Sequence, residues 1–121
     1  MSAIFLATSQ NVSNGNYVGL STTSGVYSRS TVVVPQNATI TGIALHTRDN
    51  AIGSVTATVV RSTTCDLTPS DTAATVTVND PDCCDFAPAS VAVNECDLLS
   101  VRIDYTASNL TTGVAITILL S

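Results

Sequence analysis

Hydrophobic and polar residues alternate along several stretches of this chain with a period of two. Residues 98–105 show it well: Leu99, Val101 and Ile103 occupy every second position, and polar side chains mostly fill the positions between them. Residues 38–48 and 113–120 follow the same pattern. A period of two places the apolar side chains on one face of an extended strand. No stretch has the spacing of an amphipathic helix, so the pattern predicts an all-β protein.

Turn-forming residues such as Asn14-Gly15 separate the expected strands. The predicted strands are residues 3–7, 17–21, 31–34, 38–48, 54–62, 72–78, 90–93, 98–105 and 113–120, with a turn-rich insertion at 79–88. This number of short strands predicts a two-sheet antiparallel sandwich, a jelly roll of about eight strands. An immunoglobulin-like sandwich is the main alternative, but the chain has no tryptophan for its core. We expect residues 1–16 to form an N-terminal strand and a flexible connector, and residues 17–121 to form the jelly-roll domain.

The amino-acid composition argues against two classes of binding partner and favours a third. Charged residues make up 11% of the 121 residues, and the net charge is -5 without a single lysine; ordinary soluble domains carry about 25% charge. We therefore expect no nucleic acid partner, because no basic patch is available to hold phosphates. No apolar run approaches the roughly 18 residues that span a bilayer, so no membrane partner is expected either. A neutral surface rich in Ser and Thr favours association with copies of the chain itself.

Four cysteines, Cys65, Cys83, Cys84 and Cys96, are the most informative side chains. An even number of cysteines in a surface-type protein indicates disulfides. Pairing Cys83 with Cys84 is disfavoured, because adjacent Cα atoms lie about 3.8 Å apart and disulfides span about 4.4 Å or more. Two intrachain arrangements remain: Cys65–Cys83 with Cys84–Cys96, or Cys65–Cys84 with Cys83–Cys96. Bridges between subunits and free thiols are the alternatives.

The other reactive side chains favour structural interpretations. His46 is the only histidine and lies within a predicted strand, as expected of a surface or structural residue. Asp80, Asp82 and Asp85 do not follow the spacing of a calcium loop, so a solvated acidic turn is expected. We therefore predict no catalytic residues, no metal site and no cofactor, and expect that the protein is not an enzyme.

The first predicted strand is a candidate for contacts between subunits. It is apolar, and a polar stretch separates it from the next strand. Such a strand could add to the sheet edge of a neighbouring subunit, or fold back onto its own sandwich. Its residues are Ala3, Ile4, Phe5, Leu6 and Ala7.

The segment 91–105, with the sequence VAVNECDLLSVRIDY, resembles a motif of bacterial spore-surface proteins in which a valine strand, a Gly-Asp turn and Leu-Leu/Ile-Ser-Val-Arg/Lys follow one another. Residues 40–61 and the Cys-x-Leu-Thr stretch at Cys65 are similar to neighbouring parts of the same family. The family comprises the jelly-roll domains of exosporium collagen-like proteins and endospore appendage subunits. Two departures stand out: Cys96 replaces the glycine of the turn, and no cysteine precedes Cys65.

The resemblance implies a structural, self-assembling subunit of a bacterial spore-surface layer, fibre or appendage. Its place would be the outside of a spore or cell, reached without a classical signal peptide. Subunits would join through sheet edges, with disulfides as stabilisers. The alternative is a trimeric ligand-binding module, such as a lectin-like or phage-fibre tip, but the few aromatic residues provide little of the platform that sugars commonly need.

Overall fold

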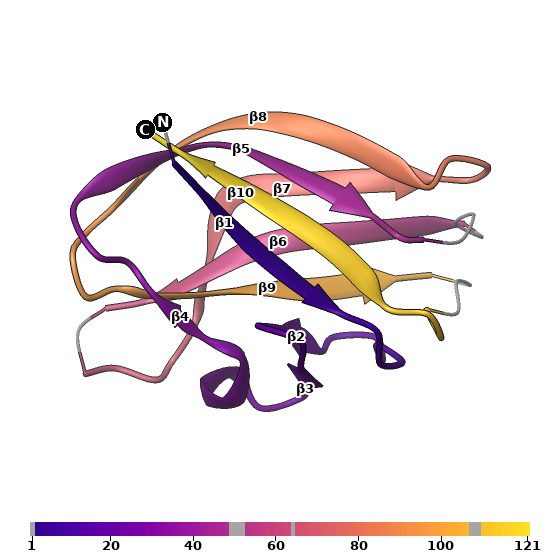
Figure 1. Cartoon of the computed structure of the whole chain (residues 1–121), viewed down its shortest axis with the longest axis horizontal. Helices are drawn as coiled ribbons and strands as arrows, with labels where there is room; N and C mark the ends of the chain where they lie inside the picture. The colour runs from indigo at the N-terminus through magenta and orange to yellow at the C-terminus, as the bar shows by residue number, and fades with distance from the viewer. Residues whose placement is uncertain (1, 49–52, 64, 107–109) are drawn as a thin grey trace.

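The computed structural model describes residues 2–48, 53–63, 65–106 and 110–121. Two antiparallel sheets pack face to face and carry nearly all of the regular structure (Figure 1). The elements in chain order are β1 (Ser2–Thr8), β2 (Tyr17–Val18), β3 (Thr23–Ser24), the short 3-10 helix η1 (Tyr27–Ser30), β4 (Val32–Val33), β5 (Ala38–His46), β6 (Ser54–Ser62), β7 (Ser70–Asn79), β8 (Cys84–Val93), β9 (Leu98–Tyr105) and β10 (Val114–Leu120).

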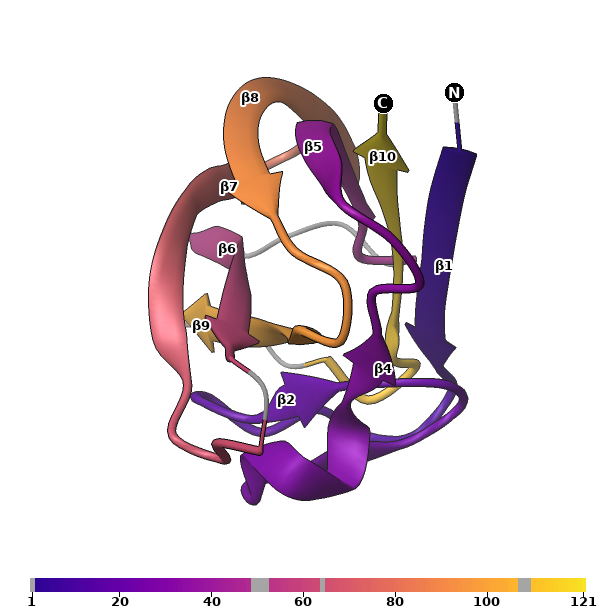
Figure 2. The same ribbon diagram turned by 90° about the vertical axis from the view of Figure 1, so that its left-hand side faces the viewer.

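The strand order confirms the predicted jelly roll. One sheet has the order β1-β10-β5-β8, and the other has the order β3-β2-β9-β6-β7. β4 also pairs with β9, next to the β2 pairing, so β2 and β4 together act as one interrupted strand. From β7 onward, consecutive strands belong to alternate sheets: β7 and β9 lie in one sheet, and β8 and β10 lie in the other (Figure 2). Taken as eight strands, β1-β10-β5-β8 faces β2/β4-β9-β6-β7, which is a double-sheet jelly roll.

The core lies between the two sheets. It contains the apolar side chains that the alternating sequence pattern predicted to be buried. Leu99, Val101 and Ile103 of β9 are fully buried, as are Ile43 and Leu45 of β5. Burial of one such side chain stabilises the fold by about 1.5–3 kcal/mol. The two-residue period therefore predicted the buried side of these strands correctly.

The expected insertion at residues 79–88 is wrong in its second half. β8 already begins at Cys84, so only residues 80–83 connect it to β7. Pro88 and its neighbours favoured a turn in the sequence, yet Pro88 lies within this strand. The sheet tolerates this proline because β8 is a terminal strand, with a neighbour on one side only.

The polar segment after β1 is anchored to the sandwich along its length. Val12 is fully buried and donates its N–H to the carbonyl of Leu110 (3.1 Å). The side chain of Asn14 accepts a hydrogen bond from the backbone N–H of Tyr105 (2.8 Å), and Gly15 donates to the carbonyl of Ile103 (2.7 Å). The segment expected to be a flexible connector lies against the end of β9 in this structure, because its backbone finds partners there.

Candidate functional site

The four cysteines lie at opposite ends of the sandwich. Cys83 and Cys84 lie at the β7–β8 connection, on the right of Figure 1. Cys65 lies in the β6–β7 connection and Cys96 in the β8–β9 connection, both on the left of Figure 1. All four are free thiols, and three are exposed while Cys83 is half-buried. Each end of the molecule therefore offers two thiols.

Neither predicted intrachain arrangement is present, and the strands explain why. β7 and β8 each contain ten residues and run the length of the molecule between the two ends. At about 3.3 Å per residue, each strand separates the two pairs of cysteines by roughly 30 Å. A disulfide joins Cα atoms about 4.4–6.8 Å apart. The predicted intrachain pairing was therefore wrong for this fold. The short spacing between the cysteines along the chain did not reveal that β7 and β8 each cross the whole molecule between the residues to be paired.

In the β8–β9 turn, Cys96 adopts a left-handed backbone conformation. It occupies the position at which the spore-surface motif has glycine. Cys96 has φ +71°, a conformation that favours glycine. Its N–H donates to the carbonyl of Val34 (2.9 Å). Asp97 closes the turn, because its carboxylate accepts from the N–H of Asn94 (2.9 Å) and its own N–H donates to the carbonyl of Asn94 (3.0 Å). These bonds hold an exposed thiol at the tip of a strained turn.

We expect Cys96→Gly to raise the free energy of unfolding by about 0.5–1 kcal/mol, because glycine adopts the left-handed conformation without the Cβ penalty. The measurement is urea unfolding of the purified protein in reducing buffer. Cys96→Ala is the matched control: it removes the thiol, keeps the Cβ, and should change stability by less than about 0.5 kcal/mol. A glycine variant less stable than the alanine variant would contradict this account of the turn.

Other candidate side chains are engaged in local contacts. The Nδ1 atom of His46 accepts a hydrogen bond from the N–H of Arg48 (2.8 Å), and the carboxylate of Asp85 accepts from the N–H of Phe86 (2.8 Å). Across the described ranges, no three or more His, Cys, Asp or Glu side chains gather as a metal site would require. Nor does the described part of the chain contain a helix with the length and apolar character needed to cross a bilayer.

The outer side of the six-stranded sheet is polar. The hydroxyls of Thr56 and Thr77 lie 2.9 Å apart across β6 and β7. Beside them, the guanidinium of Arg102 contacts the carboxylates of Asp71 and Asp104, the latter at 2.8 Å. The hydrogen bond from Arg102 lowers the pKa of Asp71. This exposed network contributes little to stability, because solvent screens surface ion pairs.

The N-terminal strand pairs with its own sandwich. β1 is antiparallel to β10 at seven consecutive positions, from Ser2–Leu120 to Thr8–Val114. Of the five candidate contact residues, Leu6 is fully buried and Ile4 packs against the core, whereas Ala3, Phe5 and Ala7 face away from it. In this structure the strand takes the alternative in which it folds back. Three of the candidate residues remain on the surface.

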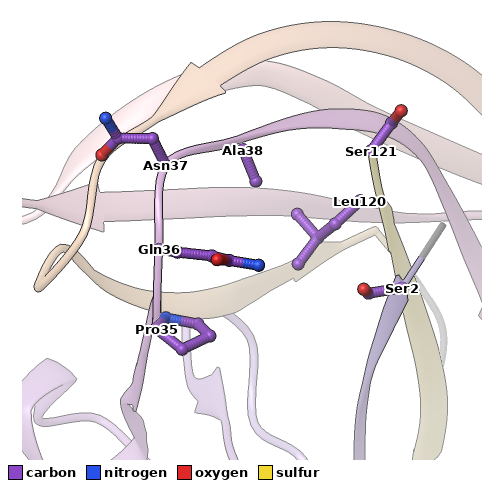
Figure 3. Close-up of a pocket in the computed structure, with 7 residues that line it drawn as sticks. All are labelled: Ser2, Pro35, Gln36, Asn37, Ala38, Leu120 and Ser121. Atoms are coloured by element: carbon purple, nitrogen blue, oxygen red, sulfur yellow. The ribbon is translucent and has the colours of Figure 1, made fainter.

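A pocket of about 220 Å³ opens beside the two chain ends (Figure 3). It lies between the residues leading into β5 and the last residues of β10. Neither a charged nor an aromatic side chain lines it, so it lacks the stacking platform of many sugar sites. Its lining consists of Ser2, Pro35, Gln36, Asn37, Ala38, Leu120 and Ser121.

Comparison with known proteins adds no relative: neither the protein-family models nor the curated proteins contain a match to this chain. One feature escaped the sequence reasoning, namely the apolar outer side of the four-stranded sheet. Its signal was present, because Ala115 and Leu119 occupy positions where the alternation of β10 would place polar residues.

Proposed function

We propose that this protein is a structural, self-assembling subunit of a bacterial spore-surface layer, fibre or appendage. The observation that carries the proposal is the placement of its four thiols, two at each end of the sandwich. The spore-surface setting comes from the sequence resemblance described above. The partner is another copy of the same chain.

Thiols at opposite ends favour head-to-tail linkage. A contact between one end of a subunit and the other end of the next is heterologous, and such contacts build open chains when the rotation does not close a ring. Disulfides between Cys83 or Cys84 of one subunit and Cys65 or Cys96 of the next would fix such a chain covalently. Each bond forms when two thiols lose two protons and two electrons to an external oxidant, such as dioxygen or a small-molecule disulfide. Exposure supports this chemistry, because a thiol must be accessible to exchange.

Unpaired sheet edges offer a second means of joining subunits. β1 and β8 are the terminal strands of the four-stranded sheet, and β7 is a terminal strand of the other sheet. Parts of these edges are already engaged: Ala7 of β1 donates to the carbonyl of Gly19 (3.2 Å) and accepts from Ser21 (2.7 Å), and Arg61 donates to the carbonyl of Ala92 in β8 (2.6 Å). An uncovered edge presents backbone donors and acceptors to a neighbouring strand.

The test compares oxidised protein with two matched double variants. We expect the wild type to give a ladder of multimers on non-reducing electrophoresis and elongated polymers by negative-stain microscopy. Cys83→Ser with Cys84→Ser removes the thiols at one end, and Cys65→Ser with Cys96→Ser removes those at the other. Under head-to-tail linkage each double variant remains a monomer, and a mixture of the two yields dimers and nothing longer.

Three results would count against the proposal. Double variants that form covalent dimers on their own would show linkage between like ends instead. An oxidised wild type that contains only monomers would remove the covalent polymer altogether. Compact trimers by microscopy would favour the ligand-binding alternative.

A further inference from the structure

The outer side of the four-stranded sheet, made by the residues of β1, β10, β5 and β8 that face away from the core, is mostly apolar and carries no Asp, Glu, Lys or Arg. We call it the apolar face. Exposed His46 and Cys84 lie in its row nearest the β7–β8 connection. The one charged residue of these strands, Asp85, pairs with buried Leu45, so it belongs to the opposite side of the sheet. The apolar face contrasts with the outer side of the six-stranded sheet, where Asp71, Arg102 and Asp104 lie.

The middle row of the apolar face runs straight across all four strands. Phe5, Thr117, Ala44 and Phe86 are cross-strand neighbours in that order. The two aromatic residues at the ends of the row are exposed by 67% and 49%, which is unusual for phenylalanine. Small side chains occupy the centre, where they let another backbone approach.

The next row of cross-strand neighbours is also apolar. Ala3, Leu119, Gly42 and Pro88 are aligned across the four strands. The ring of Phe86 lies over Gly42 so closely that a Cβ atom at this glycine would overlap it. The ring of Phe86 therefore lies along the sheet over Gly42 and does not project straight out from the face.

We propose that the apolar face stacks on the same face of a second copy of this chain. This deepens the proposed function, on which it rests, by naming the lateral contact between subunits. The row is self-complementary: a twofold axis parallel to the strands brings Phe5 of one copy opposite Phe86 of the other, and Thr117 opposite Ala44. Such an isologous contact buries both apolar faces and leaves both charged sides in water.

The size of the face fits a weak, specific pair. Four strands about 4.8 Å apart, each about 25 Å long, give a face on the order of 500 Å². Stacking two copies therefore buries roughly 1,000 Å², the lower limit for a specific interface. Absence of charge on the face means that two chains of net charge -5 bring no like charges into direct contact there. We expect a dissociation constant in the micromolar range, because an interface of this size leaves little surplus over the cost of association.

The experiment is sedimentation equilibrium of the full chain in reducing buffer, which removes covalent multimers, over a wide range of concentrations. The wild type should form a reversible dimer. Ala44→Arg places a charge at the centre of the apolar face and should weaken the dimer at least about tenfold. Ala73→Arg is the matched control, because Ala73 is exposed on β7 of the other sheet and should leave the dimer unchanged. Phe5→Ser, at a largely exposed position, repeats the test if Ala44→Arg does not fold, and circular dichroism checks the fold of each variant.

Four outcomes would overturn the inference. A wild type that is monomeric in reductant, but forms covalent multimers when oxidised, would disprove stacking through the apolar face. It would leave the proposed function unaffected. A chain that associates under neither condition would remove both. Equal weakening by Ala44→Arg and Ala73→Arg would place the contact elsewhere. A monomer that binds a fluorescent apolar dye, and loses that binding in Ala44→Arg, would assign the face to a partner of another kind.

Discussion

Replacing Gly113 by alanine is expected to lower the free energy of unfolding by about 2–5 kcal/mol, since two separate penalties combine. Gly113 precedes β10 with φ +79°, a conformation in which a Cβ atom is strained. In addition, a Cβ atom at this position would overlap the carbonyl oxygen of Thr8, at the end of β1. Backbone atoms cannot rotate away as a side chain can, so β1 and β10 would have to separate where they pair. Urea unfolding monitored by circular dichroism measures the loss.

Gly15 provides the matched control for this substitution. It has φ +83°, similar to that of Gly113, but a Cβ atom there meets no atom within 4 Å. Gly15→Ala should therefore cost only about 1 kcal/mol, the penalty of the left-handed backbone alone. Equal losses for the two variants would mean that the close approach of Thr8 to Gly113 is unimportant in solution.

Leu6→Ala is expected to cost about 2–5 kcal/mol, because it leaves a cavity at a fully buried position. The loss should be the same at low and high protein concentration, since β1 pairs with β10 of its own chain. Thermal and urea unfolding over a range of concentrations measure it. A strand donated to a neighbouring subunit would behave differently: burial of Leu6 would require a second chain, so the loss caused by Leu6→Ala would itself change with protein concentration.

Phe5→Ala is the control for Leu6→Ala on the same strand. Its side chain is 67% exposed on the apolar face, so truncation should cost less than about 1 kcal/mol in the monomer. A large loss at Phe5 that grows with protein concentration would instead report burial of the ring between subunits. A small loss at Leu6 would contradict the placement of β1 in the core.

The two proposed contacts have different chemistry, so experiments can separate them. Head-to-tail linkage depends on thiols at the ends of the sandwich and disappears in reductant. Stacking through the apolar face depends on burial of apolar surface and persists in reductant. A subunit with both contacts can extend along one direction through its ends and pair laterally through one side, while its charged side remains exposed.

The alternation along β9 and β10 was enough to predict strands, a two-layer sandwich and the buried side of each ribbon. This succeeds because the pleat fixes side-chain direction locally, so that Leu99, Val101 and Ile103 must share a face whatever their partners are. The same reasoning failed at Pro88, which the sequence placed in a turn. Whether a strand tolerates proline depends on having a neighbour on each side, and only the completed sheet decides that.

The sequence by itself thus determined the fold class and the identity of the core, because both follow from local periodicity. Tertiary structure decided where the thiols lie and how β1 is used. Pairing of β1 with β10 joins residues more than a hundred positions apart, and the separation of Cys83 and Cys84 from Cys65 and Cys96 depends on the course of β7 and β8. Neither is encoded in spacing along the chain, because contacts between distant segments arise only when all strands find their places together.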